Sequence, residues 1–232
     1  MDFNEFDKAL LQIDIQISDE PLVSLKKFFL DHDIEIDLVE NTKSHHYLRA
    51  YVAERLGDAS VLANKLGYTL RLFSAFRTID QQRELFYSRF IEMKQLHPDK
   101  EKRELLYLTN AYTAGVPILA AHTAGAAVDV ELFKSGESAL DFGTSYGTAT
   151  SQSNTLCEQI SQSGRANRQI LVNIMEKNGF TNYPFEWWHF SIGDACAAFI
   201  TGCKHTIYDP VNFDFNTGEL FHMKNKQLKS FF

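Results

Sequence analysis

The sequence predicts an α+β domain in which helices cover a mainly antiparallel sheet. Several short segments alternate polar and apolar residues, the period-two pattern of strands with one buried face. Strands of a parallel sheet run continuously apolar, so this alternation favours antiparallel pairing. The chain has 232 residues, of which 44% are hydrophobic, enough for one sizeable core. No repeat or low-complexity linker divides it, and we expect one domain over residues 1–232.

The first third of the chain is expected to intermix strands and helices. Leu11 to Ile17 has strand periodicity, and Pro21 suits the opening turn of a helix. Asp58 is suited to cap a helix, and Gly67 is placed to end it. We therefore predict strands at 11–17 and 33–38 and helices at 20–31, 44–56 and 58–67.

The middle of the chain carries stronger local signals. Thr78 and Gln81 have the spacing of a capping box, and Pro98 ends the helix that follows. Gly179 stands directly after another helical pattern. We predict strands at 68–75, 126–133 and 186–192, helices at 78–96, 99–110 and 165–177, and loops at 111–121 and 135–153. The last forty residues are expected to add strands and turns.

Charge and composition narrow the possible partners. The formal net charge of −7 argues against a nucleic-acid partner, because phosphate neutralisation needs clustered Lys and Arg. The start of the chain lacks a basic leader followed by an apolar run, so we expect a cytoplasmic protein. No stretch is as long as a membrane span, which needs about 20 apolar residues. Cys157, Cys196 and Cys203 are too few and too irregularly spaced for a disulfide framework. Small molecules and peptides remain as ligands, and nothing indicates the oligomeric state.

Two segments carry the donors that a catalytic zinc site needs. Such a site has three nitrogen or oxygen donors and an open position for water, whose pKa the metal lowers to about 7. His122 and Asp129 are separated only by small residues and Thr123. Glu186 and His189 lie in the run Phe-Glu-Trp-Trp-His, which supplies a third donor and a carboxylate suited to general base catalysis.

Each of these residues also has a structural interpretation. A lone histidine is more often a hydrogen-bonded core or surface residue than a ligand, Asp129 suits a strand end, and Trp187 and Trp188 suit core packing. His45 and His46 would point about 100° apart on a helix, so we interpret them as part of a solvated face. The combination of the His-to-Asp spacing with Glu-x-x-His is what favours a metal site.

This combination resembles the D-alanyl-D-alanine dipeptidase family of zinc peptidases, the type that includes the vancomycin-resistance dipeptidase. That family carries a His-x-x-x-Gly run ending in Asp, then Glu-Trp-Trp-His, and an earlier segment with a catalytic arginine between a strand and a helix. The resemblance covers most of residues 34–192. The matching segments are Ser74-Ala-Phe-Arg77-Thr, His122-Thr-Ala-Gly125-Ala-Ala-Val-Asp129 and Glu186-Trp187-Trp188-His189.

The resemblance implies a D,D-peptidase or Hedgehog-like zinc peptidase fold. Its catalytic motifs would lie within residues 74–192, and residues 193–232 would complete the domain. The implied reaction is hydrolysis of D-alanyl-D-alanine or a related D-amino-acid dipeptide with one Zn²⁺ per chain. The implied site residues are His122, Asp129 and His189 as metal ligands, Glu186 as the base for water and proton donor to the leaving amine, and Arg77 as the oxyanion donor.

Two positions depart from the family pattern. Ala120 stands where family members often have a serine, and Gly147 stands where they have the aspartate that receives the substrate's ammonium group. A buried ammonium without a carboxylate is costly, so either Asp141 or Glu137 pairs with it or the substrate lacks a free amine there. The candidate substrate-binding residues are Asp141, Tyr146 and Trp188.

Two other functions stay open at this point. A D,D-carboxypeptidase or endopeptidase acting on peptidoglycan peptides would fit an altered ammonium pocket. A non-catalytic zinc-binding module would use the same scaffold for binding alone. Such a module has no use for Glu186 and Arg77 beside an open coordination position, which favours an enzyme.

Overall fold

The computed structural model describes residues 3–40, 44–111, 113–134, 140–148 and 150–231. The strands are β1 (Leu22–Ser24), β2 (Asp37–Leu38), β3 (Tyr47–Arg49), β4 (Thr69–Ser74), β5 (Ala127–Phe133), β6 (Thr181–Asn182), β7 (His189–Ser191), β8 (Val211–Phe213) and β9 (Leu220–His222). The α-helices are α1 (Phe3–Leu10), α2 (Leu25–Asp31), α3 (Ala50–Lys65), α4 (Ile79–Leu96), α5 (Lys102–Asn110), α6 (Gln162–Lys177), α7 (Ala195–Thr201) and α8 (Asn225–Leu228). Short 3₁₀ turns lie at η1 (Pro117–Leu119), η2 (Ala121–Ala124) and η3 (Ser151–Ser153).

Within these residues the central sheet has five strands in the order β2-β4-β5-β7-β6. The β4–β5, β5–β7 and β6–β7 pairs are antiparallel, and only β2 joins β4 in parallel. The predicted α+β fold with a mainly antiparallel sheet is therefore confirmed. Two small antiparallel pairs, β1–β3 and β8–β9, lie outside this sheet.

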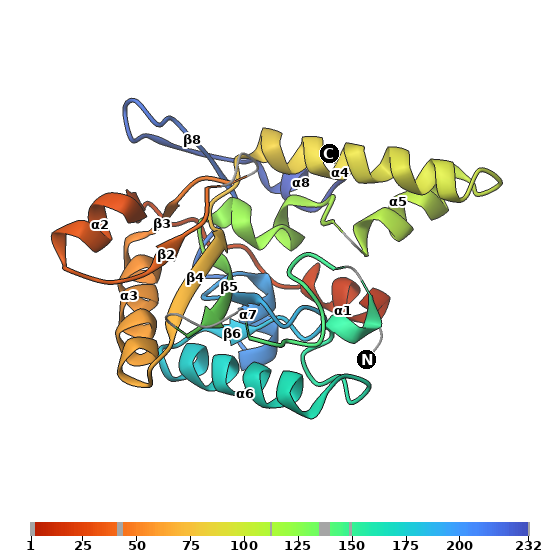
Figure 1. The fold of residues 1–232 in the computed structure, drawn as a ribbon. Coiled ribbons are helices and arrows are strands. Elements are labelled where there is room, and N and C mark those ends of the chain that lie inside the picture. Colours follow the sequence, from red (N-terminus) through yellow and green to blue (C-terminus); the bar gives the residue numbers. More distant parts are fainter. Residues whose placement is uncertain (1–2, 41–43, 112, 135–139, 149, 232) are drawn as a thin grey trace.

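Helices α3 and α6 pack against each other and against the central sheet (Figure 1). Their apolar sides enclose the main core with the buried faces of β4 and β5. The predicted helix break at Gly57 is wrong, because α3 runs through this residue. An added Cβ at Gly57 would lie 2.8 Å from the Ile34 side chain, so the glycine permits close packing rather than ending the helix.

Four predicted elements agree with the structure in type and nearly in extent. They are β4, α4, β5 and α6. The Thr78 side chain accepts a hydrogen bond from the Gln81 backbone, and the Gln81 side chain caps the Thr78 backbone in return. Ser161 caps α6 by accepting from Gly164 N at 2.9 Å, which starts that helix three residues before the prediction. Residues at the ends of these elements mark where they begin or end, so the local sequence was sufficient to predict them.

Other predictions near the N-terminus are wrong because long-range contacts decide the backbone. Residues 11–17 form no strand, since their ladder contact is a single bridge between Asp14 and His205. The helix predicted from residue 44 starts only at Ala50, because residues 47–49 pair with β1. Of the helix predicted over 20–31, only α2 forms, because the residues before it belong to β1.

Smaller corrections concern element ends. Of the strand predicted over 33–38, only β2 forms, and α5 starts after Glu101 rather than at Asp99. The strand predicted over 186–192 is shortened to β7, because the residues just before it form a turn. Helices α7 and α8 were not predicted in the last forty residues.

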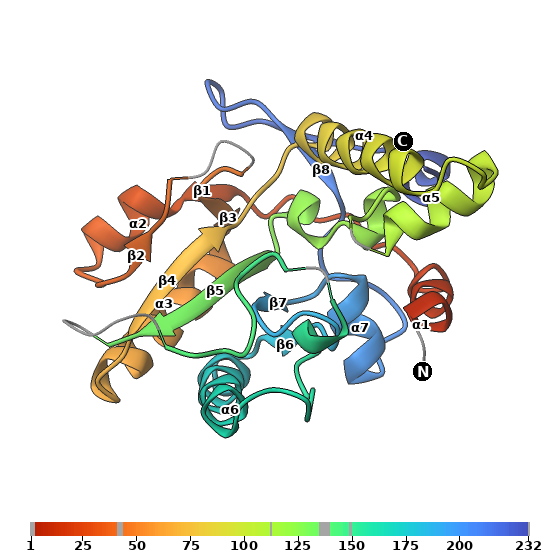
Figure 2. The same cartoon turned by 45° about the vertical axis from the view of Figure 1, so that its right-hand side comes forward.

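The remaining elements surround one end of the sheet. Helices α4 and α5 pack side by side at the end of the molecule opposite α6, and the β8–β9 hairpin lies beside α4 (Figure 2). Helix α1 packs against α7 and η1. Buried Arg49 ties the extended segment after α1 to the body, donating to the carbonyls of Ser18 and Glu20 at 2.9 and 2.6 Å.

Candidate metal centre and active-site cleft

The candidate site begins with the pairing of two central strands. Asp129 of β5 lies opposite His189 of β7 in the antiparallel register, so both side chains project from the same face of the sheet. His122 comes from η2, and the chain reaches β5 through Gly125 at φ +67°. An added Cβ at Gly125 would lie 2.3 Å from Leu22 Cδ2, so this turn needs glycine to deliver His122 beside Asp129.

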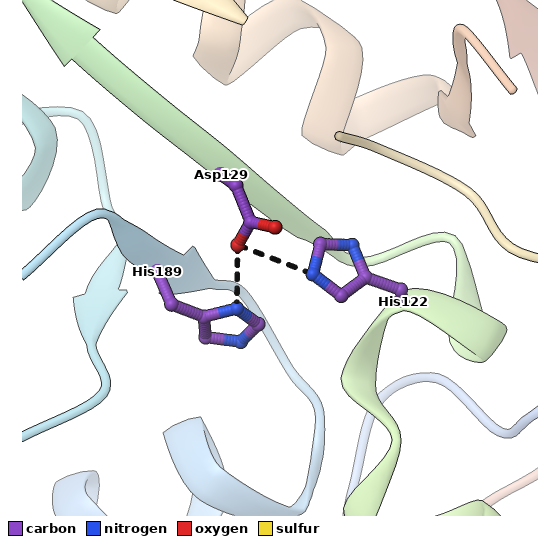
Figure 3. Close-up of side chains that lie close together, drawn as sticks. All are labelled: His122, Asp129 and His189. Atoms are coloured by element: carbon purple, nitrogen blue, oxygen red, sulfur yellow. Dashed lines mark hydrogen bonds and ion pairs between the residues drawn. The ribbon is translucent and has the colours of Figure 1, made fainter. Parts of the chain in front are cut away.

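The three predicted metal ligands converge, as Figure 3 shows. Asp129 Oδ1 lies 3.2 Å from His122 Nε2 and 2.9 Å from His189 Nδ1. One donor atom from each residue lies within 4.8 Å of the other two, and all three residues are largely buried. Donors on a tetrahedral zinc ion with bonds of 2.0–2.1 Å lie about 3.3 Å apart, close to the two separations from Asp129, and two imidazoles with one carboxylate are ligand types that zinc takes, so this donor set fits zinc.

A backbone carbonyl fixes the orientation of the His122 ring. Its Nδ1 donates to the Ala75 carbonyl at 2.6 Å, which leaves the lone pair on Nε2, the atom that faces Asp129. Burial lowers the pKa of His122 to about 4, so this imidazole is neutral at physiological pH. A neutral ring held by a backbone carbonyl is the usual state of a metal-ligating histidine.

Asp129 and the two histidines shift one another's pKa values. Burial disfavours the charged form of Asp129, but the adjacent His122 and His189 hold the pKa of this carboxyl well below its usual value. Burial also disfavours charge on His189, while the hydrogen bond to Asp129 raises the pKa of His189. A carboxylate is therefore present at the centre at neutral pH, where it supplies the negative donor that a divalent cation requires.

Two further side chains contact the outer oxygen of the same carboxylate. Asp129 Oδ2 accepts from Tyr146 Oη at 3.1 Å and from Arg77 Nη2 at 3.3 Å. Arg77 follows the end of β4, and its Nη2 also donates to Ser74 Oγ at 2.9 Å. The Nε atom of Arg77 is buried without a hydrogen-bond partner among the described residues, and the guanidinium meets the cluster through Nη2.

Glu186 lies in the turn before β7, where Glu186 Oε2 is 4.0 Å from His189 Nδ1. Burial raises the pKa of Glu186 to about 7, although the neighbouring His189 opposes the rise. A carboxyl group with a pKa near neutrality is suited to take and return a proton. The predicted base thus lies next to the predicted metal ligands.

All these groups line one cleft of about 510 Å³ that also reaches α1, α4 and α5. Tyr146, Gly147 and Trp188 of the predicted substrate region line it too. Asp141 does not line it: its carboxylate is exposed and accepts hydrogen bonds from Ser161, from Ser163 and from the Gly143 backbone. Glu137 lies outside the described residues.

Asp7 and Gln82 are among the cleft residues that were not predicted from the sequence. Asp7 lines the cleft from α1, and its Oδ2 accepts from Asn110 Nδ2 at 2.5 Å. Gln82 is 2% exposed and accepts from Arg77 Nη1 at 3.4 Å while donating to the Ala114 carbonyl. Neither residue stands in a motif, and only the packing of α1, α4 and α5 brings them here.

Three buried donors from two strands and a turn, open to a cleft beside a carboxylate and an arginine, are the arrangement of a metallopeptidase. The sequence model described as D-ala-D-ala dipeptidase matches residues 41–213. The chain belongs to this family, which confirms the predicted resemblance and the enzyme class.

The chain is also similar to individual proteins. The chain is 26% identical over 243 residues to a D-alanyl-D-alanine dipeptidase of Synechocystis, an alignment covering 92% of this chain and 98% of the relative. It is 28% identical over 155 residues to the corresponding dipeptidase of Enterococcus faecalis, with 62% and 71% covered. Among solved structures, an LdcB LD-carboxypeptidase gives a TM-score of 0.48 at 20% identity, over 84% of this chain and 81% of that one.

Among the described residues, no helix combines the length and the hydrophobicity that a membrane crossing requires. The cytoplasmic location stays a prediction.

Proposed function

We propose that the protein hydrolyses D-alanyl-D-alanine or a closely related short D-amino-acid peptide, using Zn²⁺ held by His122, Asp129 and His189. The observation that carries the proposal is the convergence of these donors within 4.8 Å, in a cleft that Glu186 and Arg77 also line. When bound there, zinc supplies a Lewis acid that polarises a carbonyl and lowers the pKa of water.

Glu186 is the proposed proton carrier. Its carboxylate takes a proton from the attacking water and passes it to the nitrogen of the leaving amino acid, which departs as a neutral amine. The pKa of about 7 describes the protein without a cation, and a bound divalent cation favours the deprotonated form that accepts the proton.

Arg77 is the proposed oxyanion donor. Negative charge develops on the carbonyl oxygen as water adds, and a preorganised cation beside that oxygen stabilises the transition state. Ser74 and Asp129 hold the guanidinium at Nη2, and Arg77 lines the cleft that a substrate would occupy.

A D,D-carboxypeptidase or endopeptidase acting on longer peptidoglycan peptides is the second candidate. Two observations favour it: Gly147 places no carboxylate at that position of the cleft, and the cleft volume of about 510 Å³ lies within the range that holds ligands of drug size. A dipeptide fills such a space only in part.

We also propose that residues 1–232 form one domain. Helix α1 precedes the family match, yet Phe6 and Leu10 are buried against Ile118 and Cys196, which lie inside it. A segment packed in this way completes a core rather than forming a separate unit.

The test is release of D-alanine by the zinc-loaded protein from D-Ala-D-Ala and from N-acetyl-D-Ala-D-Ala. Hydrolysis of the free dipeptide alone supports a dipeptidase, and preference for the blocked peptide supports the second candidate. Glu186→Gln is the matched control: it should retain zinc and lose turnover. Zinc binding without hydrolysis of either peptide by the unmodified protein would indicate a non-catalytic module.

A further inference from the structure

We propose that Tyr146 is a positioning residue whose hydroxyl makes Asp129 a one-oxygen ligand of the metal. The inference rests on the proposed function, because it takes the His122, Asp129 and His189 cluster as the metal site. It assigns to Tyr146 a role toward a metal ligand in place of the substrate contact that the sequence suggested.

The two oxygens of Asp129 have separate sets of neighbours. Oδ1 faces His122 Nε2 and His189 Nδ1, the two atoms that share the candidate metal position. Oδ2 points the other way, toward the Tyr146 hydroxyl at 3.1 Å and Arg77 Nη2 at 3.3 Å. Two donors on Oδ2 fix the plane of the carboxylate, so that Oδ1 alone is presented to a cation.

The Tyr146 hydroxyl is held in place by its ring. The ring stacks on Phe73 with centroids 4.2 Å apart and planes 4° apart, and it meets Trp188 edge-on at 5.7 Å. A phenol has an ordinary pKa of about 10 and keeps its proton at neutral pH, so the hydroxyl is a donor. Because both ring contacts survive removal of the hydroxyl, the hydrogen bond can be deleted without disturbing the packing.

The hydroxyl also influences Arg77. With Tyr146 sharing Oδ2, the guanidinium is one of two donors on that oxygen. Without the hydroxyl, Arg77 alone would satisfy the buried oxygen, which would draw the guanidinium toward Asp129 and away from the substrate. Tyr146 therefore serves the metal ligand directly and the oxyanion donor indirectly.

The test is Tyr146→Phe, with zinc affinity measured by competition against a chromophoric chelator. Loss of an outer-shell hydrogen bond to a metal ligand typically weakens binding 10–100-fold, and we expect a loss in this range. Tyr183→Phe is the matched control, since Tyr183 lines the same cleft and packs edge-on to His189 but donates no described hydrogen bond to Asp129. Its zinc affinity should match that of the unmodified protein, because this variant removes no described side-chain hydrogen bond to a metal ligand.

Thermal unfolding of the metal-free proteins accompanies the titration, and equal midpoints establish that Tyr146→Phe acts on metal binding rather than on folding. Zinc affinity unchanged in Tyr146→Phe overturns the inference, whatever the activity. If Tyr146→Phe weakens zinc binding but the unmodified protein cleaves neither dipeptide, the proposed function fails and the positioning role stands.

Discussion

Asp129 and His189 face each other across the β5–β7 ladder, and their side chains meet at 2.9 Å between Oδ1 and Nδ1. Side chains alternate between the two faces of a sheet, so a slip of one residue in this pairing would move one of them to the opposite face. The candidate metal site is thus built into the strand register, and the forces that align the two strands also align two of the three donors.

Zinc should stabilise the folded protein measurably. At a free concentration 100 times the dissociation constant, a ligand adds about 2.7 kcal/mol to the free energy of unfolding, which for a chain of this size is a rise in Tm of about 5–10 °C. We expect this rise in the unmodified protein and its loss in His189→Ala. His32→Ala, a change at the exposed residue that follows α2, should keep the rise. A full rise in His189→Ala would remove His189 from the ligand set.

Arg77→Ala should lower kcat by about 10²–10³, the usual effect of removing one oxyanion donor. KM should change little, because the interaction strengthens only as charge develops on the substrate oxygen. Steady-state kinetics on D-Ala-D-Ala at saturating zinc measure both constants. Arg83→Ala, on the exposed side of α4 next to Asp80, serves as the control. A kcat within threefold of the unmodified enzyme would contradict the assigned role.

Gly147→Asp should shift selectivity toward substrates with a free amine. Gly147 lines the cleft, and an added Cβ would meet no atom within 4 Å. Its φ of +75° is strained for most residues but is tolerated best by Asn and Asp. We expect the ratio of kcat/KM for D-Ala-D-Ala over N-acetyl-D-Ala-D-Ala to rise about tenfold, equivalent to 1.4 kcal/mol. Gly147→Asn controls for size, and an equal rise in that variant would exclude charge as the cause.

Asp7 should make stability depend on pH. Burial raises the pKa of Asp7 from 3.8 to about 7, although the hydrogen bond from Asn110 opposes the rise. A carboxyl that binds its proton more tightly in the folded state contributes stability fully below about pH 4, and this contribution is lost as the pH rises through about 7. Thermal unfolding between pH 5 and 8 should therefore show a smaller decline for Asp7→Asn than for the unmodified protein.

Glu5→Gln is the control for that experiment, because Glu5 is an exposed carboxylate on the same helix. It likewise replaces one carboxyl group by an amide and should keep the original decline. Identical pH profiles for Asp7→Asn and the unmodified protein would show that Asp7 titrates normally.

Local sequence predicted the elements whose boundaries are set by neighbouring residues. The capping box at Thr78 and Gln81 marks the start of α4, and the alternation in β4 and β5 marks strands with a buried face. It failed at residues 11–17, which alternate like a strand but are held by contacts with distant side chains, such as the hydrogen bond from the Gln16 backbone to Thr206 Oγ1. Alternation reports which residues are buried, and it does not report what they pair with.

The identities of the candidate site residues were accessible from the sequence, because the chemistry of a metal centre restricts residue types and the motifs preserve their spacing. His122, Asp129, His189 and Glu186 were named in this way, and Arg77 was named from the resemblance to the family. Their convergence, the tautomer that Ala75 imposes on His122, and the sharing of Asp129 Oδ2 by Tyr146 and Arg77 were decided only by the tertiary structure. These contacts join segments as much as 60 residues apart in the chain, and such distances are closed by the packing of the whole core, which no local pattern records.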